Sequence, residues 1–201
     1  MGRMNRSKIL YDGCYAHVFS RAADKCSIFH GDEDFGKFKE LLLETEEKFS
    51  YRIHHYCLMH THFHLAVSMD NAEGFSEGLK VVKRNYARYF NLKHQRFGPL
   101  WRDRFKSLVI EDERYLQACG RYIEGNPVEA GMAKRCEDWP HSSSRYHLKG
   151  EEDPLVTVYR FDGEALSARD DAEKFFTQGF VIGSELFKIH FEEETIIPVP
   201  G

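Results

Sequence analysis

The amino-acid sequence predicts an α+β protein: a split βαβ (ferredoxin-like) antiparallel sheet with helices on one face, followed by a C-terminal extension. The first observation is the order of the segments, which runs strand, helix, strand, strand, helix, strand, helix. The second is that two strand segments are separated by only two residues, which favours an antiparallel pair. The third is the length of 201 residues, with 42% hydrophobic and 30% charged residues, which suits one globular domain with an appendage.

Aromatic and β-branched runs predict the strands. A short run, Tyr-Ala-His-Val-Phe-Ser, covers residues 15–20. Residues 52–59 and 62–69 form two longer runs on either side of His60-Thr61, and we expect them to lie side by side. A fourth strand is predicted over residues 105–110.

Apolar residues at helical spacing predict three helices. The first covers residues 34–49. The second ends before Gly98-Pro99, and its apolar positions form one face because they are four, three, four and four residues apart: Phe75, Leu79, Val82, Tyr86 and Phe90. The third begins with the acids at 111–113 and should end near Gly125, because Asn126 precedes a proline. Residues 165–180 suggest one or two further short helices.

Composition excludes several classes of protein. No run of about 18 apolar residues occurs, so we expect no membrane span. The basic first residues are not followed by an apolar stretch of secretory length, so we expect no signal peptide. The cysteines are odd in number, widely spaced and without a CxxC pair, which favours a cytoplasmic protein over a disulfide framework or zinc ribbon: Cys14, Cys26, Cys57, Cys119 and Cys136.

Positive charge is concentrated in one part of an acidic chain. The net charge is −4, but residues 80–106 hold nine bases and one acid, so this block is +8 and the remainder is −12. Such segregation indicates a surface that binds a polyanion, although a solvated helix face is the alternative. The candidate DNA-binding residues in the block are Lys80, Lys83, Arg84, Arg88, Arg102, Arg104 and Lys106.

Two small motifs carry candidate chemistry. Residues two apart in a strand share a face, so His62 and His64 should point to one spot and could hold a divalent metal. Tyr122 and Asn126 are four apart in the third predicted helix and share its face. Structural roles are the alternative for both motifs: incidental histidines, a core tyrosine and a capping asparagine.

Three stretches together resemble a known family. Tyr56-Cys-Leu-Met-His-Thr-His62-Phe-His64-Leu-Ala-Val is similar to the HUH motif region of single-tyrosine transposases. Gly98-Pro-Leu-Trp-Arg-Asp-Arg-Phe-Lys and Arg121-Tyr122-Ile-Glu-Gly-Asn126-Pro-Val-Glu-Ala-Gly-Met resemble the tyrosine-helix region of the same family. The resemblance covers about residues 10–148 and is greatest to the REP-associated tyrosine transposases. It differs at His60-Thr61, where the family usually has Pro-Asn.

The resemblance implies a role for each matching residue. His62 and His64 take the places of the paired metal ligands, and Asn126 takes that of the third ligand. Tyr122 takes the place of the nucleophile that becomes joined to the 5′ phosphate of cleaved DNA. The implied cofactor is Mg²⁺ or Mn²⁺, although two histidines and an amide do not exclude zinc. His60 is placed where it could add an imidazole near the metal.

The expected function is DNA nicking and strand transfer on single-stranded or hairpin DNA, by a monomer or homodimer. We expect residues 1–148 to form the catalytic domain and residues 149–201 to be an extension. Two alternatives remain at this point. One is a catalytically silent protein that binds hairpins, and the other is a metal-dependent phosphoesterase in which Tyr122 is only structural.

Overall fold

A four-stranded antiparallel sheet with the strand order β2-β3-β1-β4 lies at the centre of the molecule. The computed structural model describes residues 10–161 and 164–165. Each predicted strand is present within a residue of its expected limits: β1 (Tyr15–Arg21), β2 (Tyr51–Met59), β3 (His62–Met69) and β4 (Lys106–Ile110). The order of elements and strands is that of a split βαβ sheet, so the predicted fold class is confirmed.

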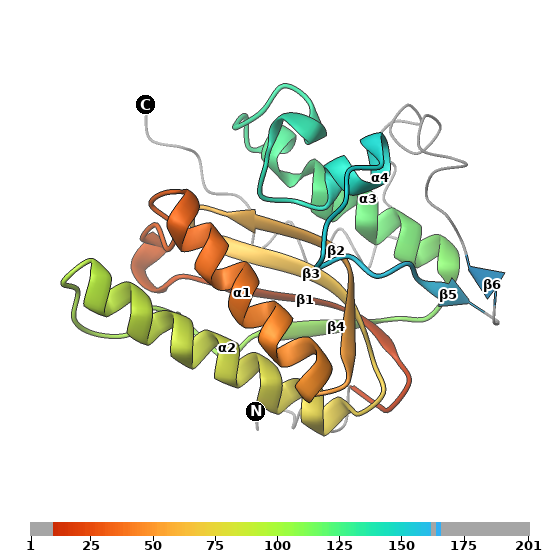
Figure 1. Ribbon diagram of the computed structural model, residues 1–201, viewed down its shortest axis with the longest axis horizontal. Helices are drawn as coiled ribbons and strands as arrows, with labels where there is room; N and C mark the ends of the chain where they lie inside the picture. Colours follow the sequence, from red (N-terminus) through yellow and green to blue (C-terminus); the bar gives the residue numbers. More distant parts are fainter. Residues whose placement is uncertain (1–9, 162–163, 166–201) are drawn as a thin grey trace, which may run out of the picture.

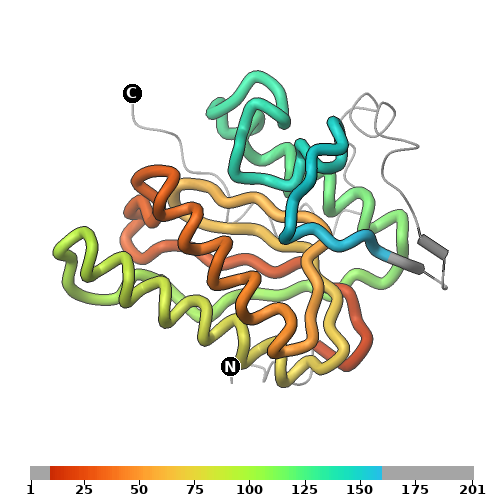
Figure 2. Tube along the Cα trace, in the orientation of Figure 1, coloured from red at the N-terminus to blue at the C-terminus, as the bar shows by residue number. Residues whose placement is uncertain are grey.

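Two long helices cover one face of this sheet. Helices α1 (Asp32–Lys48) and α2 (Ala72–Lys93) run side by side across the front of the sheet in Figures 1 and 2. The start of α1 is fastened to the end of α2 because Asp34 accepts hydrogen bonds from Lys93 Nζ (2.8 Å) and His94 Nε2 (2.9 Å). The sheet and the two helices enclose the larger apolar core.

The apolar core comes from alternate residues of each strand. Phe63, Leu65 and Val67 of β3 point toward α1 and α2 and are fully buried. They pack with apolar residues of the helices such as Phe38 and Leu79. Burial of each such side chain contributes roughly 1.5–3 kcal/mol, so this face supplies most of the drive for folding.

The third helix, α3 (Glu113–Glu129), packs on the opposite face of the sheet. The expectation of helices on one face only is therefore wrong for α3. Its Cys119 and Ile123 join a second cluster with Cys57 of β2 and Ala66 of β3. The physical reason is that the remaining face of the sheet also has to be covered, and α1 and α2 already occupy the first.

Helix α3 also continues through Pro127, which the predicted end near Gly125 did not allow. Proline has no N–H for the carbonyl of Ile123. The side-chain amide of Asn126 donates to the carbonyl oxygens of Tyr122 (2.7 Å) and Ile123 (3.4 Å) and so supplies a replacement donor. The last turn therefore survives and carries the helix to Glu129.

The chain after α3 returns to the open edge of β2. A 3₁₀ turn, η3 (Cys136–Asp138), precedes the short helix α4 (Ser144–Lys149). Leu58 N donates to the carbonyl of His141 (2.9 Å), and Ser143 N donates to that of Tyr56 (3.0 Å). Backbone groups of the edge strand are thereby paired rather than exposed.

Packing continues past residue 148, where the sequence suggested a division. Leu155 and Tyr159 are buried, and Thr157 N donates to the carbonyl of Ile53 (2.8 Å). The split into domains 1–148 and 149–201 stays a prediction about function. The short helices predicted over residues 165–180 lie outside the described residues except at Ala165. Ala165 belongs to a short hairpin formed by β5 (Arg160–Phe161) and β6 (Glu164–Ala165). Within the described ranges no helix combines the length and apolar character needed to span a membrane.

Candidate active site

The two histidines of the HxH motif lie side by side on the face of the sheet that α3 covers. Their ring centroids are 5.0 Å apart, with the rings nearly perpendicular. Phe63, between them in sequence, points to the opposite face and contacts Phe38. The strand therefore aims both imidazoles at one place, as its period of two predicts.

A histidine of the neighbouring strand holds His64 in position. His17 Nε2 lies 3.0 Å from His64 Nδ1, and both residues are buried. Burial lowers the pKa of His17 to about 3 and that of His64 well below its usual 6.5, so both rings are neutral at pH 7. When His64 Nδ1 carries the proton and donates to His17, its Nε2 presents a lone pair, which is the form that a metal ligand needs.

The ring of His62 is also oriented by a hydrogen bond, in this case with the preceding residue, Thr61. Its Nδ1 lies 3.0 Å from the hydroxyl oxygen of Thr61. Its Nε2 is buried, and no hydrogen-bond partner for it exists in the part of the chain that the structure describes. Burial, assisted by the charge of Arg21, lowers the pKa of His62 to about 4. A neutral ring with a buried, unsatisfied nitrogen fits a divalent metal.

Tyr122 approaches this pair from α3. Its ring meets the His64 ring edge-on, with centroids 5.7 Å apart, and the His17 ring with centroids 6.0 Å apart. Burial is the largest influence on its hydroxyl and raises the pKa well above 10; Glu129 also raises it. The nearby side chain of Asn126 and the charge of Arg21 act in the opposite direction.

Asn126 lies one helical turn after Tyr122 and is buried. Because its Nδ2 donates to carbonyls of its own helix, Oδ1 is the atom left to serve as a ligand. The structure thus places the His64 ring beside both His62 and Tyr122 and joins the Asn126 side chain to the backbone carbonyl of Tyr122.

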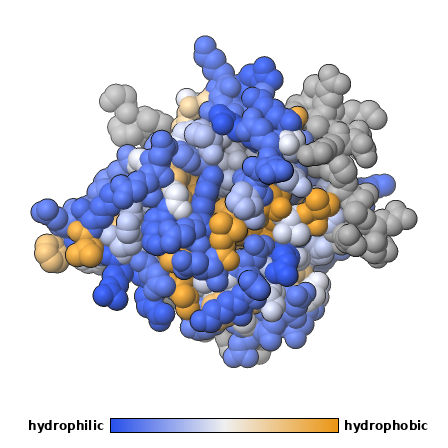
Figure 3. Space-filling view, viewed as in Figure 1, coloured by the Kyte–Doolittle hydropathy of each residue, from blue (hydrophilic) through white to orange (hydrophobic). Residues whose placement is uncertain are grey.

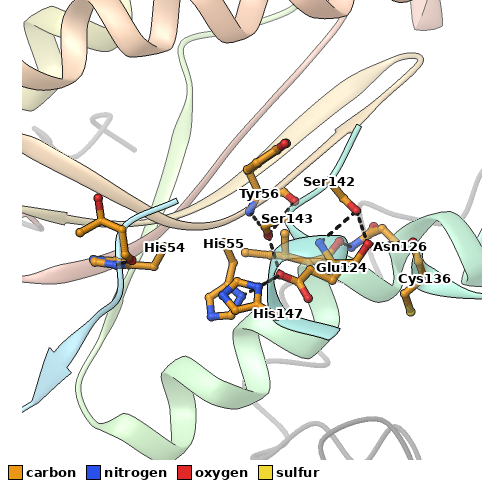
Figure 4. Close-up of polar contacts among 12 residues, drawn as sticks. His54, His55, Tyr56, Glu124, Asn126, Cys136, Ser142, Ser143 and His147 are labelled. Carbon is orange, nitrogen blue, oxygen red and sulfur yellow. Dashed lines mark hydrogen bonds and ion pairs between the residues drawn. The ribbon is translucent and has the colours of Figure 1, made fainter. Parts of the chain in front are cut away.

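A buried polar network fastens α3 to the rest of the molecule. One carboxylate oxygen of Glu124, in α3, accepts three hydrogen bonds: from His55 Nδ1 of β2 (2.9 Å), His147 Nδ1 of α4 (2.6 Å) and Ser143 Oγ (2.5 Å). Figure 4 shows these four side chains pointing toward one another between the sheet and the two helices. Glu124 is two residues after Tyr122, so the network fixes the part of α3 that carries the tyrosine.

The charges in this network are set by the close contacts. Burial alone would raise the pKa of Glu124, but His147 and His55 reverse the shift and keep it ionised. Burial likewise opposes protonation of His147, yet Glu124 raises its pKa above 6.5. The three groups are also close enough to hold a metal. Three hydrogen bonds already saturate the shared oxygen, so we assign the cluster a structural role.

Glycine at position 120 allows α3 to lie close to β2. A Cβ at this position would lie 2.5 Å from the His55 ring, so only glycine allows the helix to approach His55 this closely.

The +8 block does not form one continuous surface. The expectation that Lys83 is exposed for DNA binding is wrong. Lys83 lies one helical turn after Leu79, is buried, and donates to Ser20 Oγ (2.6 Å) and to the carbonyl of Asp103 (2.8 Å). Its ammonium is therefore not part of the exposed basic surface that the sequence predicted. Lys80 is paired with Glu77 (2.9 Å) on the exposed side of α2.

Arg84 and Arg88 are exposed on α2, on the outer side of the layer opposite to Tyr122. Figure 3 views the molecule from the side of α1 and α2 and shows a mostly hydrophilic surface there. These two arginines remain candidates for DNA contact, although they lie on the opposite side of the sheet from Tyr122.

The later bases of the block are closer to the site. Lys106 Nζ is 5.9 Å from the centroid of the Phe19 ring, which stacks on His64. Arg102 N donates to the carbonyl of Arg21 (3.0 Å), and Arg21 faces His62 across the β1–β3 pair. Arg104 is exposed in the same segment.

Sequence reasoning missed two residues of the site, His17 and Arg21. Both belong to β1, where Tyr15, His17, Phe19 and Arg21 share the face of His62 and His64. The alternation of residues in β1 predicts that His17 and Arg21 share one face of the strand. The sequence does not show that β1 pairs with β3, about 45 residues further along the chain, and this pairing brings them to the histidines.

Comparison with known proteins identifies the family. The family model described as "Transposase IS200 like" matches residues 10–126, more than half of the chain. A structure of a REP-associated tyrosine transposase bound to a REP hairpin has a TM-score of 0.61 at 18% identity, covering 84% of this chain and 96% of that one. A structure from Deinococcus radiodurans R1 that carries a transposase assignment has a TM-score of 0.41 at 17% identity, covering 62% and 97%. No curated protein matches the chain.

The family match identifies a DNA-processing enzyme. The chain belongs to the IS200-like transposases, so it is a DNA-binding enzyme of DNA transposition and recombination. The match ends at Asn126, and it includes both histidines and Tyr122. The similarity to the REP-associated enzyme establishes the shared fold.

Proposed function

We propose that this transposase cleaves and rejoins single-stranded, hairpin-forming DNA through a covalent bond to Tyr122, with a divalent metal held by His62, His64 and Asn126. One observation carries the proposal. The buried Tyr122 ring lies edge-on to the neutral ring of His64. Because His64 Nδ1 is hydrogen-bonded to His17, its Nε2 is the atom available to bind a metal. A nucleophile and a metal-binding group are thereby held at adjoining positions.

The residues present fit the proposed metal. His62 Nε2 and His64 Nε2 are nitrogen ligands, and Asn126 Oδ1 adds a neutral oxygen ligand. Burial keeps both imidazoles unprotonated, so no proton has to be displaced at pH 7. Mg²⁺ or Mn²⁺ is the expected ion, and when bound it withdraws charge from the reacting phosphate. Three protein ligands leave further coordination positions for phosphate oxygens and water.

Tyr122 supplies the nucleophile. A bond forms between its hydroxyl oxygen and phosphorus while the bond from phosphorus to the 3′ oxygen breaks. The tyrosine proton passes to solvent, and the 3′ oxygen ends as a free hydroxyl. Since the phosphotyrosine bond preserves the energy of the cleaved phosphodiester, the hydroxyl can later attack it and rejoin the strand without ATP.

The DNA strand is expected to run past the segment after α2. Arg102, Arg104 and Lys106 would contact backbone phosphates near the site, and the exposed Lys80, Arg84 and Arg88 would contact a more distant part of a folded hairpin. The REP-associated enzyme that shares the fold was determined with a REP hairpin bound, which supports a hairpin as the substrate class. Five free cysteines fit the proposed cytoplasmic location, in which the enzyme acts as a monomer or homodimer.

Incubation with labelled hairpin DNA and Mn²⁺, followed by a denaturing gel, tests the proposal. Wild-type protein should form a covalent DNA–protein band, whereas EDTA or His62→Ala should prevent it. His60→Ala is the matched control. Its Nδ1 lies 3.2 Å from the carbonyl of Phe29 and its ring contacts Trp139, so cleavage should continue.

The outcomes separate the rival functions. Binding without any cleavage would indicate a silent hairpin-binding protein. Cleavage without a covalent band would indicate a phosphoesterase in which Tyr122 is structural. Loss of cleavage in His60→Ala would place that imidazole at the metal and revise the ligand set.

A further inference from the structure

Arg21 is a partly buried cation for which the described residues supply no counter-ion. It ends β1, directly opposite His62. Its Nε is buried and, within residues 10–161 and 164–165, has no hydrogen-bond partner. Burial lowers its pKa, and the charge of Arg102 lowers it further. Holding a guanidinium in this way is unfavourable unless an anion compensates its charge.

The neighbours of Arg21 strengthen this positive field. Arg102 N donates to the carbonyl of Arg21, and Lys106 pairs with Phe19 in the neighbouring strand of the sheet. Lys106 has its pKa lowered by burial and then by the charges of Arg102 and Arg21. The carboxylate that also acts on Lys106 is that of Asp103, which is exposed and pairs with Arg102 at 3.4 Å. Among the described residues no carboxylate pairs with Arg21 itself, so its guanidinium is suited to an anion that comes from outside the chain.

The position of Arg21 indicates which anion. Arg21 faces His62, whose ring lies beside that of His64, and the Tyr122 ring meets the His64 ring. The charge of Arg21 also acts on the His62 imidazole and on the Tyr122 hydroxyl. Guanidinium groups match phosphate with two parallel hydrogen bonds, which lysine does not provide. An anion bound there would lie beside Tyr122.

We propose that Arg21 binds the phosphate that Tyr122 attacks and that Arg102 binds the adjacent phosphate of the same strand. This inference rests on the proposed function and adds a substrate-binding residue to it. Arg21 would hold two non-bridging oxygens, orient phosphorus toward Tyr122, and stabilise the negative charge that develops as the tyrosine proton is lost.

The decisive test uses Tyr122→Phe protein, which prevents reaction, and an oligonucleotide that the wild-type protein cleaves. One version carries an uncharged methylphosphonate at the cleavage position. Protein with Arg21 should bind the methylphosphonate version at least tenfold more weakly than the normal version. With Arg21→Gln added, normal DNA should bind at least tenfold more weakly, and the methylphosphonate should cause little further loss.

Controls distinguish this role from a structural one. Arg114→Gln, an exposed arginine on α3, should keep the full sensitivity to the methylphosphonate. Arg21→Gln should unfold at the same temperature as the parent or a higher one, because it removes an uncompensated charge. Full methylphosphonate sensitivity in Arg21→Gln, or a lowered unfolding temperature, would overturn the inference.

A second measurement does not depend on cleavage. With ¹⁵N-labelled arginine, the Nε–H signal of Arg21 should shift saturably as inorganic phosphate is added, whereas that of Arg114 should not. A shift at Arg21 in a protein that never cleaves DNA would retain the anion site and reject the proposed function. Cleavage through Tyr122 with no shift at Arg21 would retain the function and reject the anion site.

Discussion

Both faces of the central sheet are covered by helices, but one is apolar and the other contains buried polar and charged side chains. Toward α1 and α2, β3 presents Phe63, Leu65 and Val67; toward α3 it presents His62 and His64. The first face stabilises the fold by removing apolar area from water. The second holds buried neutral histidines and an arginine, Arg21, for which the described residues supply no counter-ion. Strand alternation thus separates the apolar core from the proposed site within one eight-residue strand.

The sharpest contrast is between neighbouring residues of β3. His64→Ala should reduce DNA cleavage at least 1000-fold, about 4 kcal/mol of transition-state stabilisation, because the reacting phosphate loses the polarising metal. Binding of DNA and the unfolding free energy should change little. Cleavage rates and urea denaturation of the same preparation provide both values.

Leu65→Ala is the matched change on the other face. Its side chain is fully buried, so the variant should lose about 2–5 kcal/mol of stability while the folded molecules still cleave DNA. The comparison of the two faces fails if His64→Ala cleaves normally at saturating Mn²⁺, or if Leu65→Ala is as stable as wild type.

The polar network at Glu124 lies on the same side of the sheet as His62 and His64, but it stabilises the fold by holding α3 in place. Glu124→Ala leaves His147 without its partner and should cost about 3–5 kcal/mol of unfolding free energy. Ser143→Ala, which removes one neutral donor to the same oxygen, should cost about 1 kcal/mol. Equal and small losses in denaturant titrations would show that the network does not hold α3.

Acid should destabilise the protein through the histidine-bearing face. His54 is buried, its Nδ1 donates to the carbonyl of Thr157 (2.7 Å), and burial lowers its pKa to about 4. Between pH 6.5 and 4 the unfolded chain binds the proton and the folded chain does not, so the unfolding free energy falls as pH falls. His147, whose pKa is raised, acts oppositely and loses its contribution as pH rises.

Replacement of His54 tests this dependence. His54→Gln should reduce the slope of unfolding free energy against pH below 6.5 by up to about 1.4 kcal/mol per unit. Stability that stays constant or increases between pH 7 and pH 5 in the wild-type protein would contradict the assignment.

The smallest expected effect concerns the outer surface of the apolar face. Charge reversal at Arg84 and Arg88 should lower the slope of log K against log salt for single-stranded DNA by about 0.7 for each lost phosphate contact. Arg102→Glu, near the site, should lower both the slope and the cleavage rate. An unchanged slope in the double variant would make the α2 arginines a solvated face.

Local patterns predicted most of the fold because each strand and helix has its own periodicity. The bounds of β3 were predicted to the residue, and the shared face of His62 and His64 followed from them. What could not be predicted depends on non-local pairing. The partnership of His17 with His64 requires the register of β1 on β3, and the burial of Lys83 requires the position of Ser20.

The end of α3 shows a different limit. The rule that helices end before proline is sound for the backbone alone, but the Asn126 amide restores a donor to the freed carbonyl. The same side chain is the proposed third ligand. The local rule failed at a residue to which we assign a second role, as is common in functional sites.

Mapping of the DNA–protein adduct tests the central claim most directly. Wild-type protein incubated with hairpin DNA and Mn²⁺ should give one modified peptide, with the 5′ phosphate of the cleaved strand on the Tyr122 hydroxyl. Tyr122→Phe, which removes one oxygen and preserves the packing against His64, should give none. A nucleotide on Tyr115, two turns earlier in α3, or an adduct that persists in Tyr122→Phe, would contradict the account.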